Sequence, residues 1–316
     1  MTTGAAPAAI ADVSVVMPAW RAQATIARAL ASIAAQTVRA REVIVVDDGS
    51  NDGTCAAAEA MSDMLAPTAL KVFRQQNAGP GAARNRAIAE SSGGLLAFLD
   101  ADDEWLPEKL EISLKPLADP DVVLVAHNIV LQDGEALRHL DCARHLPAGA
   151  DAFPALFKRG FVATSSVVCR RDAIEAAGGF DESLPSGQDY ELWLSIARFD
   201  PRRFALLSDY LTRYHVLPGS VSSKVDLRRR CSAAVARRHA GGLRKRTKHG
   251  FFVLLARLAI IAAEAAIAHA QRRSWFAAAA SALSFPFAAA GAARVYFTGD
   301  GKAGRRVPAR WMGEEN

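Results

Sequence analysis

Short apolar runs that alternate with helix-like segments constrain this chain more than any other feature. The first run, residues 13–17, is closed by Pro18, and apolar residues then recur at helical spacing over residues 25–36. The same unit follows three more times, with apolar runs at residues 42–46, 70–73 and 95–99. Because the runs are apolar on both faces, they predict an α/β fold in which helices cover both faces of a mostly parallel, Rossmann-like sheet.

The regular repeat ends after a fifth apolar run at residues 122–126. Residues 131–163 mix Gly, Pro, His and charged residues without a period, so we expect loops and short elements there. Further strands are predicted at residues 164–169, 204–207 and 211–215, and a helix at residues 189–198. We assign residues 1–225 to one α/β domain.

Charge is distributed very unevenly along the 316 residues. Residues 1–225 carry 21 Lys and Arg against 28 Asp and Glu, a net charge of −7, whereas residues 226–316 carry 17 against 5, a net charge of +12. Hydrophobic residues make up 51% of the chain, which excludes intrinsic disorder. We therefore treat residues 226–316 as a basic, Ala-rich helical tail, whose charge predicts an anionic partner such as nucleic acid or anionic lipid.

The cysteines and the N-terminus indicate a reducing compartment. Cys55, Cys142, Cys169 and Cys231 form no CxxC pair, so neither a disulfide framework nor a zinc site is indicated. The first 16 residues contain no Lys or Arg, and so lack the charged start of a secretory signal. We expect the body of the protein to be cytoplasmic.

Polar residues follow four of the predicted strands, at the positions where open parallel α/β sheets bind ligands. They are Pro18-Ala19-Trp20, Asp47-Asp48, Gln76-Asn77 with Arg84, and Asp100-Ala101-Asp102-Asp103. Asx turns at the start of loops are the alternative explanation for each acid alone. Several acids at one edge repel one another unless a positive charge lies among them, so we expect a divalent cation. Mg²⁺ and Mn²⁺ bind carboxylates together with a diphosphate, and Asp102, flanked by Asp100 and Asp103, is the best-placed ligand.

These segments carry a resemblance to a known family. The motifs are VSVVMPAW, EVIVVDDGSNDGT, QNAGPGAARNRAI, LLAFLDADDEWLPEKL and GQDYELWLSIA, in this order. The sequence resembles the family 2 glycosyltransferases, which have the GT-A fold, and especially the bacterial exopolysaccharide enzymes of the succinoglycan type. The resemblance covers residues 13–220, roughly two thirds of the chain.

The resemblance implies roles for individual residues. Asp100 and Asp102 match the DxD motif, whose first acid contacts the ribose or the sugar and whose last contacts the metal. Asp189 matches the family's catalytic base, with Gln188 in place of the more common Glu. The other matching positions bind the donor: Pro18, Ala19 and Trp20 line the nucleotide base, Asp47 or Asp48 binds the uracil, and Arg84 lies near the nucleotide. Trp20-Arg21 stands where the family more often has Tyr-Asn.

A carboxylate base suits the chemistry that this family performs. The acceptor hydroxyl attacks an anomeric carbon and loses its proton while the diphosphate leaves from the opposite face, so one base suffices for inversion. The alternative is that Asp189 is a simple N-terminal cap of its helix. Phosphatases with an aspartyl nucleophile also contain the Asp100-x-Asp102 spacing, but Asp103-Glu104-Trp105 lacks their usual Thr.

The basic tail contains two apolar segments. In residues 251–270, Arg257, Glu264 and Gln271 recur every seven residues, and we expect them on a face opposite Leu254, Leu255, Leu258 and Ile261. The second segment, residues 275–293, is interrupted by Pro286. Three interpretations are open: a helix in the membrane interface with its Lys and Arg at anionic headgroups, packing on the body or on a second subunit, and a transmembrane hairpin. We favour the first, and expect no nucleic-acid binding because no known module is present.

The sequence therefore predicts an inverting glycosyltransferase that depends on Mg²⁺ or Mn²⁺. It would move a sugar from a nucleotide donor, which we expect to be UDP-linked, to a lipid-linked oligosaccharide. We expect it to be peripheral on the cytoplasmic face of the membrane. The alternative is a non-catalytic nucleotide-sugar-binding or membrane assembly subunit, which would not need Asp100, Asp102 and Asp189 intact.

Overall fold

The computed structural model describes residues 10–216 and 224–298 of the chain. Contacts group the chain into two compact units, which we call the sheet unit and the helical unit. The sheet unit comprises Met1–Gly149, Val162–Ala176 and Arg202–Val216, and the helical unit comprises Ala150–Phe161, Ala177–Pro201 and Leu217–Asn316. The domain boundary expected at residue 225 remains a prediction. Two segments used in the sequence analysis lie outside the described residues. They are residues 1–9, which form most of the N-terminal segment that was tested for a secretory signal, and the tail beyond residue 298.

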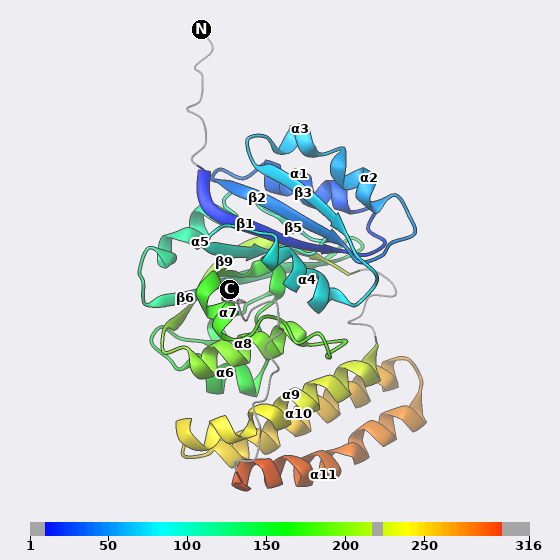
Figure 1. Cartoon of the computed structure of the whole chain (residues 1–316). Coiled ribbons are helices and arrows are strands. Elements are labelled where there is room, and N and C mark those ends of the chain that lie inside the picture. Colours follow the sequence, from blue (N-terminus) through cyan, green and yellow to red (C-terminus); the bar gives the residue numbers. More distant parts are fainter. Residues whose placement is uncertain (1–9, 217–223, 299–316) are drawn as a thin grey trace, which may run out of the picture. The chain divides into compact units, whose positions relative to one another are not determined.

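One mixed sheet of nine strands forms the sheet unit, in the order β3-β2-β1-β4-β8-β6-β9-β5, with β7 paired to β6 (Figure 1). The first four strands along the chain are parallel, and they are β1 (Ile10–Ala19), β2 (Arg39–Asp47), β3 (Ala69–Arg74) and β4 (Leu95–Phe98). The others are β5 (Glu104–Trp105), β6 (Val122–Asp133), β7 (Ala136–Leu140), β8 (Val168–Arg170) and β9 (Arg203–His215). β8 is antiparallel to both β4 and β6. The α/β architecture is confirmed, and the predicted donor-binding residues lie in its parallel half.

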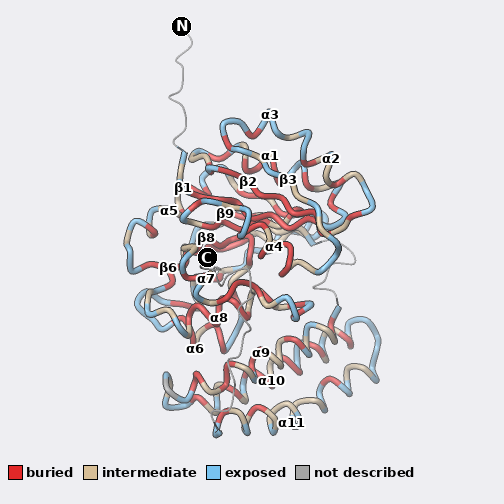
Figure 2. The backbone as a smooth tube through the Cα atoms, viewed as in Figure 1, coloured by how far each residue is buried: buried red, intermediate tan, exposed pale blue. Residues whose placement is uncertain are grey.

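Helices cover both faces of this parallel half, as expected. Val13, Val15 and Met17 of β1 belong to a core that also includes residues of α1 (Ile26–Ala34) and α5 (Lys109–Leu117). α4 (Pro80–Ala89) contacts β1 and β2 from the opposite face (Figure 1). The central strands are buried along most of their length (Figure 2). Three short helices complete the unit: α2 (Thr54–Glu59), α3 (Ser62–Leu65) and α7 (Arg171–Ala176).

Two segments of the sheet unit differ from the prediction. Residues 164–166 form a 3-10 turn, so only residues 168–170 of the expected strand are extended. The turn closes because both the hydroxyl and the backbone N–H of Ser166 donate to the carbonyl of Ala163, at 2.7 and 3.0 Å. Residues 131–140, expected to be irregular, form a β6–β7 hairpin across Gly134, which has a φ of 58°.

The described part of the helical unit consists of α6 (Ala152–Lys158), α8 (Gln188–Phe199), α9 (Val225–Arg246), α10 (Gly250–Gln271) and α11 (Trp275–Thr298). The three tail helices contact one another, α9 and α10 contact α6, and α9 contacts α8. Pro286, expected to interrupt the second apolar segment, lies inside α11, and the helix continues to Thr298. The tail therefore packs on helices that precede it in the sequence.

The prediction for the faces of α10 was wrong for Arg257, whereas Glu264 and Gln271 are exposed and Leu254 is buried, as expected. Arg257 is only 6% exposed and lies on the same buried face as Leu258 and Ile261. Residues four positions apart share a helix face, which places Arg257 beside Ile261. The Arg257 guanidinium lies 5.1 Å from the centre of the Tyr190 ring, and this contact explains how a cation is accommodated inside the unit.

Candidate functional site

Asp48 shapes the loop that precedes α4. It directly follows β2, and its backbone N–H donates to the carbonyl of Ala19 at the end of β1, at 2.8 Å. Its carboxylate accepts three hydrogen bonds of 2.8 to 2.9 Å, from the side-chain amide of Gln75 and the backbone N–H groups of Ala78 and Gly79. An ionised carboxylate has about four acceptor positions. Asp48, which is 3% exposed, therefore holds this loop with three of these positions.

Asp47 holds the turn that follows β2. It is 1% exposed, and its carboxylate accepts from the backbone N–H of Ser50 at 3.1 Å and from the thiol of Cys55 at 3.2 Å. The Nε of Arg74 lies 3.6 Å from the same carboxylate. Gly49 has a φ of 79°, and a Cβ there would lie 2.9 Å from a backbone nitrogen of the facing loop. The turn therefore needs glycine, and both acids are fixed at the sheet edge.

The segment predicted to line the base, Pro18-Ala19-Trp20, is at the end of β1. Pro18 and Ala19 are buried in the strand, whereas Trp20 is 53% exposed. The guanidinium of Arg21 lies 4.7 Å from the centre of the indole, within cation–π range. The exposed part of the indole is large enough to contact a second flat ring.

Three acids lie together after β4. Asp100, Asp102 and Asp103 each offer a carboxylate oxygen within 4.8 Å of the others. Arg84 on α4 is 5% exposed and donates to the carboxylate of Asp100 at 2.5 Å. The fold thus brings together two residues that the sequence assigned to the donor, Arg84 and Asp100, although they come from different motifs.

Asp103 is the structural member of this group. It is fully buried, and its two carboxylate oxygens accept from the hydroxyl of Ser165 at 2.5 Å and from the backbone N–H of His215 at 3.2 Å. Burial, followed by the charges of Asp102 and Asp100, raises the pKa of Asp103 well above its usual range. The Ser165 hydroxyl also accepts from the backbone N–H of Asp100 at 3.2 Å. One serine therefore fixes both ends of the acidic loop.

Asp102 is half-buried and strongly affected by its surroundings. Burial, followed by the negative charge of Asp100, raises the pKa of Asp102 to about 6. A nearby cation would stabilise the charged form of such a carboxylate. Carboxylate oxygens are the ligands that Mg²⁺ and Mn²⁺ prefer, usually with a phosphate as a further ligand. The half-buried pair Asp100 and Asp102 therefore fits a divalent cation. Asp103 instead holds the loop in place through its hydrogen bonds to Ser165 and His215.

Side chains from α1 and β9 hold this loop from two directions. Arg28 on α1 donates to the carbonyl of Asp102 at 2.7 Å, and its Nε lies 3.1 Å from the carboxylate of Glu104. The Nε2 of His215, on β9, lies 2.6 Å from the same carboxylate. The sequence did not indicate Arg28, Ser165 or His215, because each one acts through a contact that exists only in the folded chain.

Asp189, the predicted base, belongs to the helical unit. It is the second residue of α8 and is half-buried, and its carboxylate accepts from the backbone N–H of Tyr190 at 2.7 Å. The cap position is occupied by Gly187, which has a φ of 73°. Asp189 is therefore not the N-cap residue but lies in the first turn of the helix.

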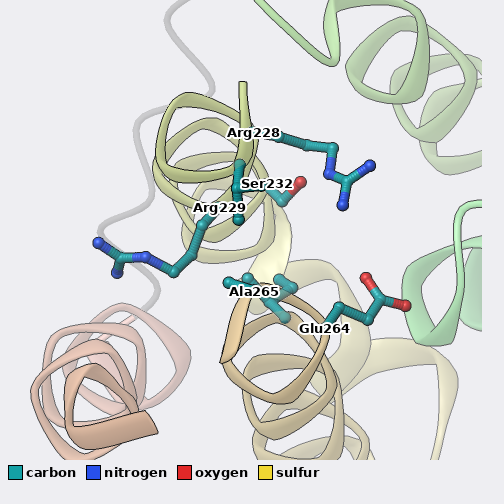
Figure 3. Close-up of a pocket in the computed structure, with 7 residues that line it drawn as sticks. Arg228, Arg229, Ser232, Glu264 and Ala265 are labelled. Carbon is teal, nitrogen blue, oxygen red and sulfur yellow. The ribbon is translucent and has the colours of Figure 1, made fainter. Parts of the chain in front are cut away.

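The tail helices turn polar side chains toward one another. A small pocket between α9 and α10 has Arg228 and Ser232 on one wall and Glu264 on the other (Figure 3). Across the same two helices, Asp226 and His269 lie 3.3 Å apart. Polar groups therefore line the surface between α9 and α10, where Arg228 and Glu264 are exposed, whereas most of the buried residues of the tail are apolar.

Large apolar side chains lie on the solvent-exposed surface of the tail helices α10 and α11. On α10, Phe252 and Ile267 are 69% and 59% exposed. On α11 the exposed group comprises Trp275, Phe276, Leu283, Phe287 and Phe297, each at least 60% exposed, and Figure 2 shows few buried residues along this helix. Both helices are long and apolar enough to cross a membrane, with mean hydropathies of 2.2 and 1.5. An exposed apolar surface of this size indicates a lipid or protein partner.

Comparison with known proteins identifies the family. The chain matches Glycosyl transferase family 2 over residues 14–177. Because the match covers more than half of the chain, the protein belongs to this family. The matched range includes every predicted donor-binding and metal-binding residue, from Pro18 to Asp102, and ends before Asp189.

Curated relatives act in polysaccharide synthesis, in agreement with the resemblance described above. The succinoglycan biosynthesis protein ExoO of Rhizobium meliloti is 30% identical over 256 residues, which cover 76% of this chain and 72% of that protein. The Escherichia coli protein WfgD, a UDP-Glc:alpha-D-GlcNAc-diphosphoundecaprenol beta-1,3-glucosyltransferase, is 27% identical over 213 residues, covering 67% and 79%. Two uncharacterized Rickettsia glycosyltransferases are 29% identical over 215 residues, and the chain spans 35% of their length.

Solved structures share the GT-A fold with this chain. Residues 1–349 of Staphylococcus aureus TarS superpose with a TM-score of 0.63 at 18% identity, covering 90% of this chain and 89% of that one. The mannosyltransferase PcManGT of Pyrobaculum calidifontis, solved with GDP-Man and Mn²⁺, gives a TM-score of 0.56 at 20% identity, covering 94% and 92%. The predicted fold is confirmed.

Proposed function

We propose that the protein is an inverting, metal-dependent glycosyltransferase of bacterial exopolysaccharide or cell-surface polysaccharide synthesis. The observation that carries this proposal is that, in a family 2 chain, Asp100 and Asp102 lie together after the parallel strand β4 and Arg84 of α4 binds Asp100. Asp48 follows the parallel strand β2 in the same half of the sheet. We take the donor to be UDP-linked and the acceptor to be a lipid-linked oligosaccharide, because the name of WfgD contains a UDP-sugar and a sugar linked to a lipid diphosphate.

The donor nucleotide would lie along the ends of β1 and β2. Pro18 and Ala19 form the floor of this site, and Trp20 stacks on the base. Asp47 or Asp48 would accept the uracil N–H; both are buried, at 1% and 3% exposed, and both already bind backbone N–H groups of the neighbouring loops. Arg84 lies near the diphosphate, and Asp100 contacts the ribose or the sugar.

Asp102, with Asp100, would hold Mg²⁺ or Mn²⁺. When bound there, the cation would act as a Lewis acid that neutralises the diphosphate leaving group. Arg84 supplies a fixed positive charge beside the same acids and so lowers their mutual repulsion. Ser165 and Arg28 keep the loop in the conformation that presents both carboxylates.

Asp189 would act as the general base. Its carboxylate takes the proton of the acceptor hydroxyl while the hydroxyl oxygen forms a bond to the anomeric carbon. The bond from that carbon to the diphosphate breaks on the opposite face, and the configuration inverts.

The tail would place the enzyme at the cytoplasmic face of the membrane. The exposed group on α11 presents aromatic side chains that can enter the acyl boundary of a bilayer. Residues 226–316 carry a net charge of +12, which favours anionic headgroups. A peripheral enzyme held in this way would meet a lipid-linked acceptor in the plane of the membrane.

A panel of nucleotide sugars tests the proposed function. Purified protein is incubated with each donor, with and without Mn²⁺, and release of the nucleoside diphosphate is measured. We expect release from a UDP-sugar, dependent on Mn²⁺ and lost in Asp102→Asn, whereas Asp63→Asn on α3, an exposed acid far along the chain from the loop, should behave as wild type. Donor binding without release from any donor would support the non-catalytic subunit instead.

A further inference from the structure

Arg238, on α9, bridges two acids that lie on either side of Asp189 in the sequence. Its Nη1 lies 2.6 Å from Oδ2 of Asp181, in the segment before α8, and 3.4 Å from Oε1 of Glu191, in the first turn of α8. The side chain of Asp181 is 13% exposed and that of Glu191 is 1% exposed. One residue of the tail therefore contacts both the segment that precedes α8 and the first turn of α8.

Arg238 supplies a compensating charge to the buried Glu191. Its carboxylate also accepts from the Ser195 hydroxyl at 3.1 Å and lies 3.3 Å from Nε2 of His239. Burial lowers the pKa of His239 to about 3, so this ring is neutral at neutral pH. A buried carboxylate without a cation is strongly unfavourable. Arg238 thus supplies a positive charge that holds Glu191 in place.

The neighbouring residue Tyr190 is held by other helices of the same unit. Its hydroxyl donates to the carbonyl of Phe157 on α6 at 3.2 Å, and the guanidinium of Arg257 on α10 covers its ring. The ring packs so closely on Gly160 that a Cβ there would lie 2.9 Å from a ring carbon. Both residues that follow Asp189 are therefore fixed by contacts with neighbouring helices, including the tail.

We propose that Arg238 is a positioning residue for Asp189, which makes the tail part of the catalytic machinery as well as a membrane contact. This inference rests on the proposed role of Asp189 as the base. A base must lie within hydrogen-bond reach of the acceptor hydroxyl, and a displacement of about 1 Å can cost about 100-fold in rate. Loss of Arg238 would remove one of the contacts that hold the first turn of α8, and would let the Asp189 carboxylate shift.

The test compares Arg238→Gln with Arg237→Gln, its exposed neighbour on α9. The assay is hydrolysis of the UDP-sugar identified by the panel, with water in place of the acceptor hydroxyl. We expect Arg238→Gln to lower kcat by about 10- to 100-fold, with KM and UDP affinity nearly unchanged, and Arg237→Gln to match wild type. Arg238→Lys should recover part of the lost kcat, because an ammonium keeps the charge but lacks the planar, rigid set of donors of a guanidinium.

A double variant separates positioning from a general structural effect. In the Asp189→Asn background, Arg238→Gln should cause little further loss, because a base that is absent cannot be misplaced. Multiplicative losses, or a wild-type rate in folded Arg238→Gln, would overturn the proposal. If Arg238→Gln does not fold, as judged by circular dichroism, Asp181→Asn takes its place, because it leaves the buried pair with Glu191 intact and should lower kcat in the same direction.

These experiments also distinguish the two proposals from each other. If Asp189→Asn keeps the wild-type rate, the proposed base is wrong. If Asp189→Asn loses the rate while Arg238→Gln or its substitute keeps it, the base stands and the positioning role of Arg238 is wrong.

Discussion

Ser165 donates a hydrogen bond of 2.5 Å to the buried carboxylate of Asp103. The backbone carbonyl of Ser165 also accepts from the indole N–H of Trp105 at 2.7 Å and from the hydroxyl of Thr212 at 3.2 Å. The turn that interrupts the strand expected at residues 164–169 is thus the support of the acidic loop. The position of Asp100 and Asp102 depends on a residue more than 60 positions away.

Ser165→Ala should therefore weaken both the fold and the binding of the cation. Removal of the hydroxyl takes one partner from a buried carboxylate, which costs about 1–3 kcal/mol of unfolding free energy. It also frees the backbone of Asp100, so affinity for Mn²⁺ with UDP should fall. Urea unfolding and calorimetry measure the two effects.

Ser166→Ala is the matched control for this variant. Ser166 is also buried, but its hydroxyl donates to the carbonyl of Ala163, away from the acids. We expect a loss of stability with unchanged affinity for Mn²⁺. Equal losses of Mn²⁺ affinity in the two variants would contradict the supporting role of Ser165.

Binding of Mn²⁺ should depend on pH around the pKa of Asp102. With that pKa raised to about 6, the free protein carries a proton on Asp102 below this pH and a negative charge above it. The cation competes with this proton, so affinity should fall as the pH is lowered through 6, by at most about tenfold per pH unit. Calorimetry between pH 5 and 7.5 tests this, and Asp102→Asn should bind weakly with no such dependence. A wild-type affinity equal at pH 5 and pH 7 would exclude Asp102 as the titrating ligand.

Features that depend only on residues close together in the sequence could be predicted from the sequence. The strand–helix repeat and the acids Asp48 and Asp102 at strand ends follow from local periodicity and loop position, and the structure places them as expected. Arg28 and His215 could not be found in this way, because 74 residues separate Arg28 from the carbonyl it binds and 111 separate His215 from Glu104. The face of Arg257 was misjudged because a seven-residue spacing alone does not say whether a face is buried.

Asp189→Asn should lower the transfer rate and leave nucleotide binding intact. The amide keeps the shape of the carboxylate but cannot take a proton, so we expect a loss of about 100-fold or more, the usual contribution of a general base. UDP affinity should stay near wild type, since the proposed donor-binding residues are in the sheet unit. Turnover assays and calorimetry measure the two quantities, and a variant that kept most of its rate would require another base.

Gly49→Ala should disturb the donor site although Asp47 and Asp48 themselves are unchanged. The added Cβ would meet the backbone nitrogen of Asn77 at 2.9 Å, and the residue would have to keep a φ of 79°. Because Asn77 also donates to the carbonyl of Asp48, the loop must shift, and we expect weaker UDP binding. Gly134→Ala, also at positive φ but in open space at the β6–β7 turn, is the control for backbone strain and should leave UDP binding unchanged. UDP affinities that fall equally in both would point to a general loss of stability.

The outside of the tail should bind membranes through two separable contributions. Each Lys or Arg near an anionic surface contributes about 1 kcal/mol, and salt screens this part. Burial of an exposed Phe contributes about 2 kcal/mol, which salt does not remove. Phe276 and Phe287 are 96% and 82% exposed on α11, so we expect Phe276→Ser with Phe287→Ser to remove most of the salt-resistant flotation with anionic vesicles.

Substitution on the exposed face is a sharper test of the anchor than truncation after Lys224, because truncation would also remove Arg238 and expose the helices beneath the tail. Ala280→Ser, an exposed position on the same helix, controls for added polarity and should float as wild type does. Vesicle flotation of the full-length proteins at low and high salt gives the comparison. Equal flotation of the double variant and wild type would exclude α11 as the lipid contact. Release by detergent alone, and not by carbonate, would identify α10 and α11 as a transmembrane hairpin, in which Arg257 must stay shielded inside the helical unit.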